Sequence, residues 1–273
     1  MTLRRIPRWI LHNLKVRLRK AYDFFLFRKE ALTLGWRERH GSQDPAGSLP
    51  VPPPLLRFRV HGSFDRDEYL RIGEVCGRNI RDLLTGVGRD LYAFDTILDF
   101  GCGSGRVLRT FQDRPASCRL YGTDIDRQAI AWCRTHLDIA TWNTNAAMPP
   151  TAYPDQSFDF VYAISVFTHL DERMQFAWLN ELKRISKPGG VLLLTVHGSS
   201  HAEEVRAQLS DSGFLFHVDQ TGLFKRDGLP DFYQTAFHSR AYIDEQWSRL
   251  FRILDYRERG IGGVQDAVIL LNQ

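Results

Sequence analysis

Short apolar segments alternate with amphipathic segments through the middle of this 273-residue chain. The apolar runs predict buried strands, and the segments between them carry apolar residues at spacings of three and four, which predicts helices. The predicted strands span residues 96–100, 119–123, 139–143, 158–164 and 191–196. The predicted helices span residues 65–85, 106–113, 127–136 and 172–185. This alternation is typical of an α/β fold with a doubly wound parallel sheet.

The regular alternation of predicted strands and helices ends near residue 195. The elements expected there are helices over 202–209 and 241–251, and strands over 214–218, 232–237, 253–257 and 266–271. The glycine-rich link at 260–263 is short enough for a hairpin, so the last strand is expected to be antiparallel. The sequence therefore predicts a seven-stranded sheet with an antiparallel last strand, and an insert at about 198–248 before the sixth strand.

The first 39 residues form a basic arm with helical spacing. Its apolar positions recur every three or four residues, at Leu3, Ile6, Ile10, Leu14, Leu18, Tyr22 and Phe25. Pro7 restricts where this amphipathic helix can begin. Residues 40–63 start with a stretch rich in glycine, serine and proline, which predicts a linker. Residues 64–273 are then expected to form the main domain.

The formal charge of +4 is unevenly distributed along the chain. Residues 1–30 hold nine Lys and Arg against two acidic residues, a net +7, so the other 243 residues sum to −3. The main domain is not basic, which argues against a nucleic-acid partner. We expect the arm to dock on an anionic membrane surface or on a partner protein, or to pack against its own domain.

Apolar runs and cysteines suggest where the protein resides. Every apolar run is shorter than the roughly 20 residues of a membrane span, and we identify no signal peptide. The four cysteines follow neither CxxC nor zinc-site spacing, which favours reduced thiols and no metal centre. We therefore expect a cytoplasmic protein, which the arm could hold at the inner membrane surface.

A turn of alternate glycines follows the first predicted strand, at Gly101, Gly103 and Gly105. Glycine permits positive φ and lets the backbone approach a ligand more closely than a Cβ would allow. Asp99 precedes the first glycine by two residues, where its carboxylate can face an ammonium group. Dinucleotide-binding proteins have such a turn too, but Arg106 stands here in place of the third glycine of their GxGxxG motif.

Further candidate residues follow the next three strands, at the edge where an open α/β sheet binds ligands. Asp124 lies 23 residues after the first glycine of the turn and can accept hydrogen bonds from both hydroxyls of a ribose. Ile125 can lie against one adenine face, and Asn145 and Ala146 can contact the adenine edge. Ser165 begins the loop after the fourth strand.

These motifs, with the Lys-Pro-Gly-Gly turn at 187–190, resemble in order and spacing those of class I S-adenosylmethionine (SAM)-dependent methyltransferases. The resemblance covers residues 97–195. It implies a Rossmann-like fold, SAM as the cofactor and a methyl-transferring enzyme, with Asp99 near the amino-acid part of SAM. The turn that holds Asn145 often presents an acid in the family, so this sequence departs from the pattern there.

The C-terminal third adds a second resemblance, to methyltransferases of bacterial surface-glycan gene clusters. It rests on residues 195–198, 237–242, 247 and 263–266. It implies a small-molecule or glycan acceptor, methylated at oxygen in polysaccharide biosynthesis. Two other functions stay open: a non-catalytic SAM-binding regulator, and an NAD-dependent oxidoreductase, which Asp99, Arg106 and the 187–190 turn disfavour.

Three histidines are candidates for a general base, which an acceptor hydroxyl of high pKa would need. His197 and His238 are the main ones, because histidine titrates near neutral pH and both lie beside the expected acceptor mouth. His169, in the loop after the fourth strand, is the third. Each of them could instead be a structural histidine.

Overall fold

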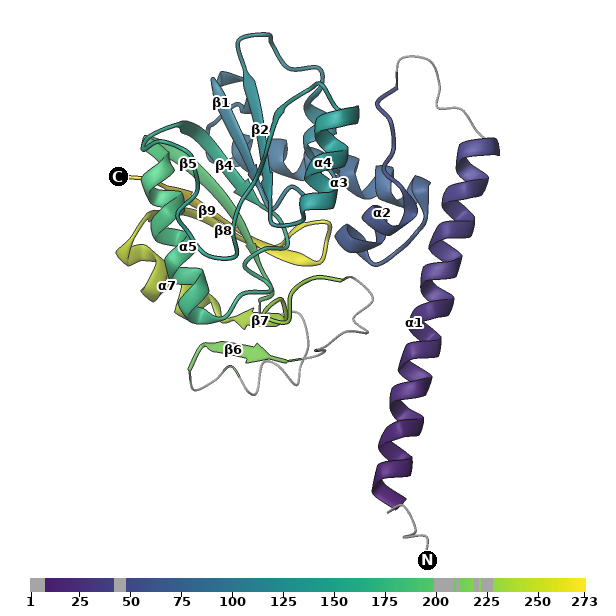
Figure 1. Cartoon of the computed structure of the whole chain (residues 1–273). Helices are drawn as coiled ribbons and strands as arrows, with labels where there is room; N and C mark the ends of the chain where they lie inside the picture. Colours follow the sequence, from purple (N-terminus) through teal and green to yellow (C-terminus); the bar gives the residue numbers. More distant parts are fainter. Residues whose placement is uncertain (1–7, 42–47, 199–208, 210–211, 219–220, 222–227) are drawn as a thin grey trace, which may run out of the picture.

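Seven strands form one central sheet in the computed structural model, which describes residues 8–41, 48–198, 209, 212–218, 221 and 228–273 (Figure 1). The strands are β1 (Thr96–Phe100), β2 (Arg119–Asp124), β3 (Thr141–Thr144), β4 (Phe158–Ala163), β5 (Ser186–Val196), β8 (Arg252–Ile261) and β9 (Gln265–Leu271). Their order across the sheet is β3-β2-β1-β4-β5-β9-β8. Pairing is parallel from β3 to β5, and β9 runs antiparallel to both β5 and β8. The predicted doubly wound sheet with its antiparallel last strand is confirmed.

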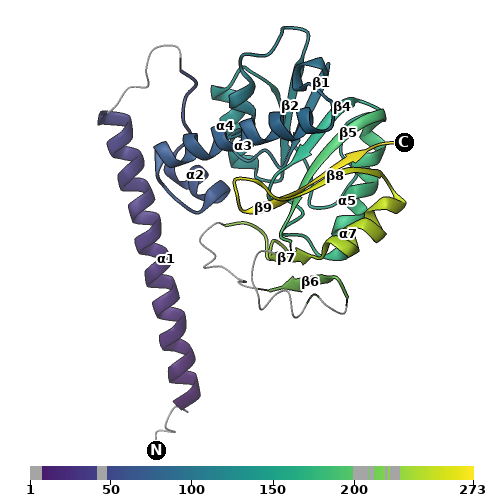
Figure 2. The same ribbon diagram turned by 180° about the vertical axis from the view of Figure 1, so that it is seen from behind.

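The sheet lies between two layers of helices (Figures 1 and 2). One layer holds α3 (Arg66–Gly86) and α4 (Arg127–His136), the other holds α5 (Glu172–Ile185) and α7 (Arg240–Gln246), and single 3-10 turns form η1 (Leu91–Ala93) and η3 (Trp247–Arg249). Along β5, Leu193 packs toward α3 and α4, whereas its neighbours Leu192 and Leu194 pack toward α5 and α7. Because side chains alternate along a strand, a sheet covered on both faces needs apolar residues at every position.

The segment 40–63, which the sequence predicts as a linker, contains a helix, α2 (Pro54–His61). Pro54 stands at the start of the helix, where its missing N–H is not needed and its fixed φ suits helical backbone. Gly62 ends the helix in the left-handed region, with a φ of 77°. The run of prolines therefore marks a helix start rather than an extended spacer.

The helix predicted over 106–113 is also wrong, because only the 3-10 turn η2 (Leu108–Phe111) follows the glycines. The Thr110 hydroxyl donates to the Val107 carbonyl and competes with helical hydrogen bonding. Pro115 has no N–H and disfavours helical backbone at the residue before it. The segment therefore makes one turn and continues into β2.

The predicted insert holds a separate two-stranded antiparallel sheet of β6 (Phe214–His217) and β7 (Thr235–His238). The strand expected over 232–237 starts later, because the Tyr233 amide donates to the Pro230 carbonyl in a turn. The helix expected over 202–209 lies outside the described residues, apart from Leu209.

The basic arm forms one helix, α1 (Arg8–Gly41), as its spacing predicts. Its second half packs on α2, while its first half projects away from the main domain (Figures 1 and 2). The ring centroid of Phe27 lies 4.6 Å from that of Phe58 and 5.0 Å from that of Phe64. None of the described helices combines the length and the apolarity that a membrane crossing requires.

Candidate functional site

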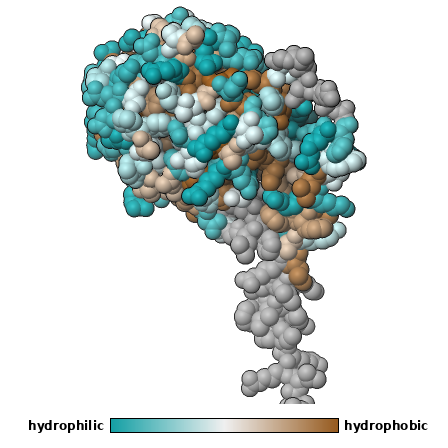
Figure 3. Space-filling view, turned by 45° about the horizontal axis from the view of Figure 1, so that its top comes forward, coloured by the Kyte–Doolittle hydropathy of each residue, from teal (hydrophilic) through white to brown (hydrophobic). Residues whose placement is uncertain are grey.

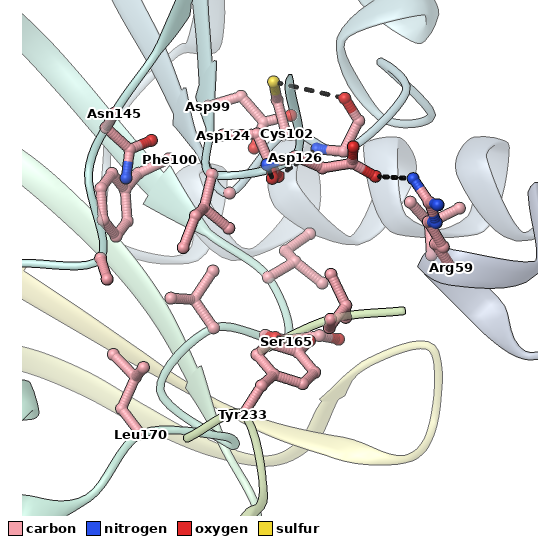
Figure 4. Close-up of a pocket in the computed structure, with 18 of the residues that line it drawn as sticks. Arg59, Asp99, Phe100, Cys102, Asp124, Asp126, Asn145, Ser165, Leu170 and Tyr233 are labelled. Atoms are coloured by element: carbon pink, nitrogen blue, oxygen red, sulfur yellow. Dashed lines mark hydrogen bonds and ion pairs between the residues drawn. The ribbon is translucent and has the colours of Figure 1, made fainter. Parts of the chain in front are cut away.

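A pocket opens where strands β1 to β4 end, at the edge where open α/β sheets bind ligands (Figure 4). It brings together eight of the nine residues predicted to contact a cofactor: Asp99, Gly101, Gly103, Asp124, Ile125, Asn145, Ala146 and Ser165. The ninth, Gly105, faces the core, where a Cβ would lie 2.9 Å from atoms of Leu137 and of Trp142. Gly105 is therefore a packing glycine rather than part of the pocket lining.

Two glycines of the turn are required by close approach. Gly101 and Gly103 have φ values of 81° and 52°, which side chains rarely adopt. A Cβ on Gly101 would lie 2.2 Å from Val166, and one on Gly103 would lie 2.4 Å from Val60 of α2. Larger residues at either position would push the neighbouring elements apart and distort the pocket.

The carboxylate of Asp124 is held at the end of β2 by backbone amides on both sides. Its Oδ2 accepts from the Gly103 N–H at 2.7 Å, and its Oδ1 accepts from the Asp126 N–H at 2.7 Å. Burial raises the pKa of this carboxyl, while these hydrogen bonds oppose the shift. Each oxygen keeps a further lone pair, so the group can also accept from two hydroxyls of a ligand.

Asp99 lies deeper, at the end of β1, with 3% of its surface exposed. Burial raises the pKa of its carboxyl to about 8, and the neighbouring Asp124 carboxylate adds to the shift. Arg106 acts in the opposite direction, but its charge does not cancel the effect of burial. A cationic ligand beside Asp99 would favour the ionised form and lower this pKa.

Helix α2 contributes a pocket residue that the sequence analysis missed. Arg59 donates to the Asp126 Oδ2 at 2.7 Å, and both side chains are nearly buried, with 12% and 10% exposed (Figure 4). The next residue, Val60, lies against Gly103. The apolar and basic alternation of 55–60 was the available signal, but treating the segment as a linker hid it.

Ser165 is held in a strained conformation at the other end of the pocket (Figure 4). Its φ of 59° lies in the left-handed region, which costs a non-glycine residue about 1–3 kcal/mol. Its N–H donates to the Thr195 hydroxyl at 2.9 Å, and its own hydroxyl accepts from the Gln265 amide at 2.7 Å. Its carbonyl accepts from the Tyr233 hydroxyl at 3.1 Å. Strain sustained by three partners is typical of a functional position.

The wall around Ser165 is apolar and aromatic, in contrast to the end that holds the carboxylates. It is lined by Ile164, Val166, Leu170, Leu229, Phe232 and Tyr233. Aromatic rings there offer flat surfaces on which a ring of an acceptor can stack. The pocket therefore has a charged end and an apolar end, which suits two different ligands side by side.

His238, one of the two main candidate bases, lies in the core rather than in the pocket. It has no exposed surface, and its Nε2 lies 2.8 Å from the Gln175 Oε1. Burial lowers the pKa of its imidazole to about 3. A buried group with that pKa stays neutral and is a very weak base at neutral pH, so its place in the core argues against the predicted catalytic role of His238.

His169 and His197 lie behind the pocket wall, and neither is among the described residues that line it. The His169 ring stacks on Tyr233 with centroids 4.0 Å apart, and its Nδ1 lies 2.5 Å from the Gln234 carbonyl. The His197 ring lies 6.1 Å from that of His169 and 5.5 Å from that of Phe237. The structure thus places His169 directly against the pocket residue Tyr233 and His197 next to His169, and a catalytic role of either histidine stays a prediction.

A structural role for His238 predicts a loss of stability instead of a loss of chemistry. His238→Ala should lower the free energy of unfolding by about 2–4 kcal/mol, because it leaves a cavity and removes the partner of the Gln175 Oε1. Protonation of His238 favours the unfolded chain, so its contribution is complete above about pH 6.5 and is lost as the pH falls toward 3. Denaturant melts of both proteins across this range would measure the change, with exposed His217→Ala as control. An equally stable His238→Ala protein with a hundredfold lower kcat would contradict this role.

Comparison with known proteins agrees with this geometry. Residues 98–194 match the family described as a methyltransferase domain. The 2-methyl-6-phytyl-1,4-hydroquinone methyltransferase of Synechocystis sp. is 27% identical over 190 residues, which cover 62% of this chain and 58% of that protein. The 27-O-demethylrifamycin SV methyltransferase of Amycolatopsis mediterranei is 28% identical over 150 residues, which cover 49% of each. The chain thus spans about half the length of these relatives.

Solved structures share the fold at low sequence identity. The Burkholderia thailandensis 1,6-didemethyltoxoflavin-N1-methyltransferase, solved with S-adenosylhomocysteine, has a TM-score of 0.53 and 13% identity, covering 85% of this chain and 98% of that one. A chain in the complex of the Haloferax volcanii Trm112 methyltransferase activator with a putative methyltransferase has a TM-score of 0.52 and 15% identity. That match covers 82% of this chain and 99% of the other.

Proposed function

We propose that this chain, which carries a class I SAM-dependent methyltransferase domain, transfers the methyl group of SAM to an oxygen atom of a small-molecule or glycan acceptor. One observation carries the proposal: a single pocket joins the carboxylates of Asp99 and Asp124 to an aromatic wall around Ser165 and Tyr233. The names of the relatives from Synechocystis and Amycolatopsis point to small-molecule methylation, which supports such an acceptor.

The residues of the charged end fit SAM. Asp124 would accept from the ribose hydroxyls, Asn145 and Ala146 would border the adenine, and Asp99 would face the methionine ammonium. An ammonium group is the partner that Asp99 needs, since burial holds its carboxyl largely protonated without a cation. When bound, SAM supplies a methyl group on a sulfonium, which is already activated for displacement.

The remaining task of the protein is alignment. Holding the acceptor oxygen in line with the reacting centre can contribute roughly 7–11 kcal/mol to catalysis. Phe232 and Tyr233 would pack against the ring of the acceptor. Ser165 would hold Tyr233 in place, because the Tyr233 hydroxyl donates a hydrogen bond to the Ser165 carbonyl. With both ligands bound, these side chains would also exclude water from the region between them.

Methyl transfer from isotope-labelled SAM, screened over sugar and phenol acceptors with mass spectrometry of the products, tests this function. We expect acceptor-dependent formation of a methylated product.

Tyr233→Ala should lower kcat/KM for the acceptor about 10–100-fold, because it removes a stacking surface, while the Kd for SAM stays unchanged. His217→Ala, an exposed change in the same insert, is the control. Unchanged turnover in Tyr233→Ala would contradict the placement of the acceptor, and SAM binding without turnover would favour a SAM-binding regulator.

A further inference from the structure

Helix α1 exposes an unusual number of large apolar side chains. Eight such residues are exposed in the described part of the chain, and six of them lie on α1: Leu18, Tyr22, Phe25, Leu26, Leu32 and Trp36. Their exposed fractions run from 42% to 70%. Scattered single apolar residues are ordinary on a surface, whereas a concentration on one element marks an interaction site.

Five of these residues lie along one stripe of the helix. Leu18, Tyr22, Phe25, Leu32 and Trp36 recur at helical spacings of three, four or seven, which places them on one face of α1. Phe27 and Ala31, which are buried against the body, lie on the opposite side of the same helix. The stripe therefore points away from α2 and the main domain, and Figure 3 shows apolar residues gathered where the helix joins the body.

Basic residues stand in and beside the stripe. Lys29 occupies its middle, Arg39 continues it beyond Trp36, and Arg19 and Arg28 lie on its two flanks. The nearest acids are farther round the helix, and Glu38 is already paired with Arg57 of α2. The N-terminal residues 1–30 carry a net +7 in all, nine basic against two acidic side chains. The surface is thus a mainly apolar stripe that contains Lys29 and has further cationic residues along its edges.

This charge pattern decides which partner fits. Two copies packed along the stripe would place Arg19 and Arg28 in the flanking positions where paired helices need opposite charges. An anionic bilayer complements the whole surface instead: aromatic and leucine side chains enter the interface, and long basic side chains reach the lipid headgroups. At 34 residues, α1 is roughly 50 Å long, enough to lie along a membrane surface.

We propose that α1 binds the surface of an anionic lipid bilayer through this stripe and so holds the methyltransferase domain at a membrane. The stripe is independent of methyl transfer, because none of its residues lines the pocket. Each basic residue near an anionic leaflet adds about 1 kcal/mol, or roughly a fivefold gain in partitioning.

Sedimentation of the full chain with vesicles tests the proposal. We expect binding to equimolar phosphatidylglycerol and phosphatidylcholine at low salt, weaker binding at high salt, and little binding to phosphatidylcholine alone. Phe25→Ser with Leu32→Ser should lower partitioning at least tenfold, since two apolar side chains leave the interface. Val218→Ser with Val264→Ser, which changes the two exposed large apolar residues that lie outside α1 in the described part of the chain, should bind as the unchanged protein does.

A second pair of variants tests the charges. Arg19→Glu with Arg28→Glu should lower partitioning on anionic vesicles at least twentyfold, while Arg71→Glu with Arg78→Glu on α3 should have a much smaller effect. The Kd for SAM and the helical circular dichroism should be unchanged in all four proteins. If the full chain does not sediment with anionic vesicles at low salt, the proposal is wrong. If light scattering instead shows a dimer that Phe25→Ser with Leu32→Ser abolishes, the stripe binds a second copy and the membrane proposal is likewise overturned.

Discussion

Replacing Asp124 with alanine is expected to weaken SAM binding by two to three orders of magnitude. The carboxylate has two functions at once, because it would accept from the ribose and it also holds the Gly103 and Asp126 amides in place. Hydrogen bonds to a charged group contribute about 1.5–3 kcal/mol each, so the loss of two to the ligand should cost at least about 3 kcal/mol. Calorimetry of SAM binding would measure it directly.

Asp138→Ala is a suitable control for this experiment, since Asp138 is an exposed acid outside the pocket. Its Kd for SAM should match that of the unchanged protein. The Kd of Asp124→Asn for SAM should lie between those of the unchanged protein and Asp124→Ala, because the amide keeps one acceptor oxygen but loses the charge. Unchanged affinity in Asp124→Ala would contradict the placement of the ribose at the end of β2. NAD should not bind the unchanged protein. If it does bind, the alternative function of an NAD-dependent oxidoreductase is favoured instead.

Asp99→Asn is expected to stabilise the ligand-free protein and to impair its function. The pKa of the Asp99 carboxyl is about 8 in the folded protein, against a usual value near 4. The folded state therefore binds an extra proton between these values, and its stability falls as the pH rises from about 4 through 8. Asparagine carries no such charge, so at pH 8 the variant should be more stable by about 2–5 kcal/mol. Thermal melts of the ligand-free proteins at several pH values would show two curves that diverge as the pH rises.

The same substitution should weaken SAM binding about 30–1000-fold, because it removes the partner of a buried ammonium group, worth about 2–4 kcal/mol. In the unchanged protein, SAM binding should become tighter as the pH rises toward 8, since the ligand requires the ionised carboxylate. The Asp99→Asn protein should lack this dependence, and any slope that remains would report the titration of SAM itself. Equal pH profiles of the Kd in both proteins would show that Asp99 does not face the ammonium.

Local patterns in the sequence determined the sheet and the charged end of the pocket. The strands of this sheet are buried on both faces, so each one is a nearly continuous run of apolar residues in the sequence. Such short runs between helical segments are typical of a parallel sheet covered by helices. Gly101 and Gly103 adopt positive φ, which excludes most side chains, and the short connection between β1 and β2, which holds only the turn η2, places Asp124 beside them. These features depend on neighbours in sequence, so they could be predicted without tertiary contacts.

The same kind of reasoning failed where a residue's role depends on distant partners. The three histidines had suitable chemistry. The sequence did not show that His238 is buried and pairs with Gln175, which lies 63 residues away. It also did not show that the His169 ring stacks on the ring of Tyr233, a residue of the pocket wall. Burial decides whether an imidazole can act as a base, and burial is a property of the packed insert.

The sequence by itself determined the doubly wound sheet, the glycine turn and the acids that flank it, because periodicity and turn chemistry act over a few residues. Only the tertiary structure decided that α2 brings Arg59 to Asp126 across 67 positions, and that Gln265 reaches Ser165 across 100. It also decided which face of α1 is covered and which is exposed, since helical spacing marks both faces as apolar. Contacts of this range form when layers pack together, and the free energy that selects them comes from burial shared by many elements.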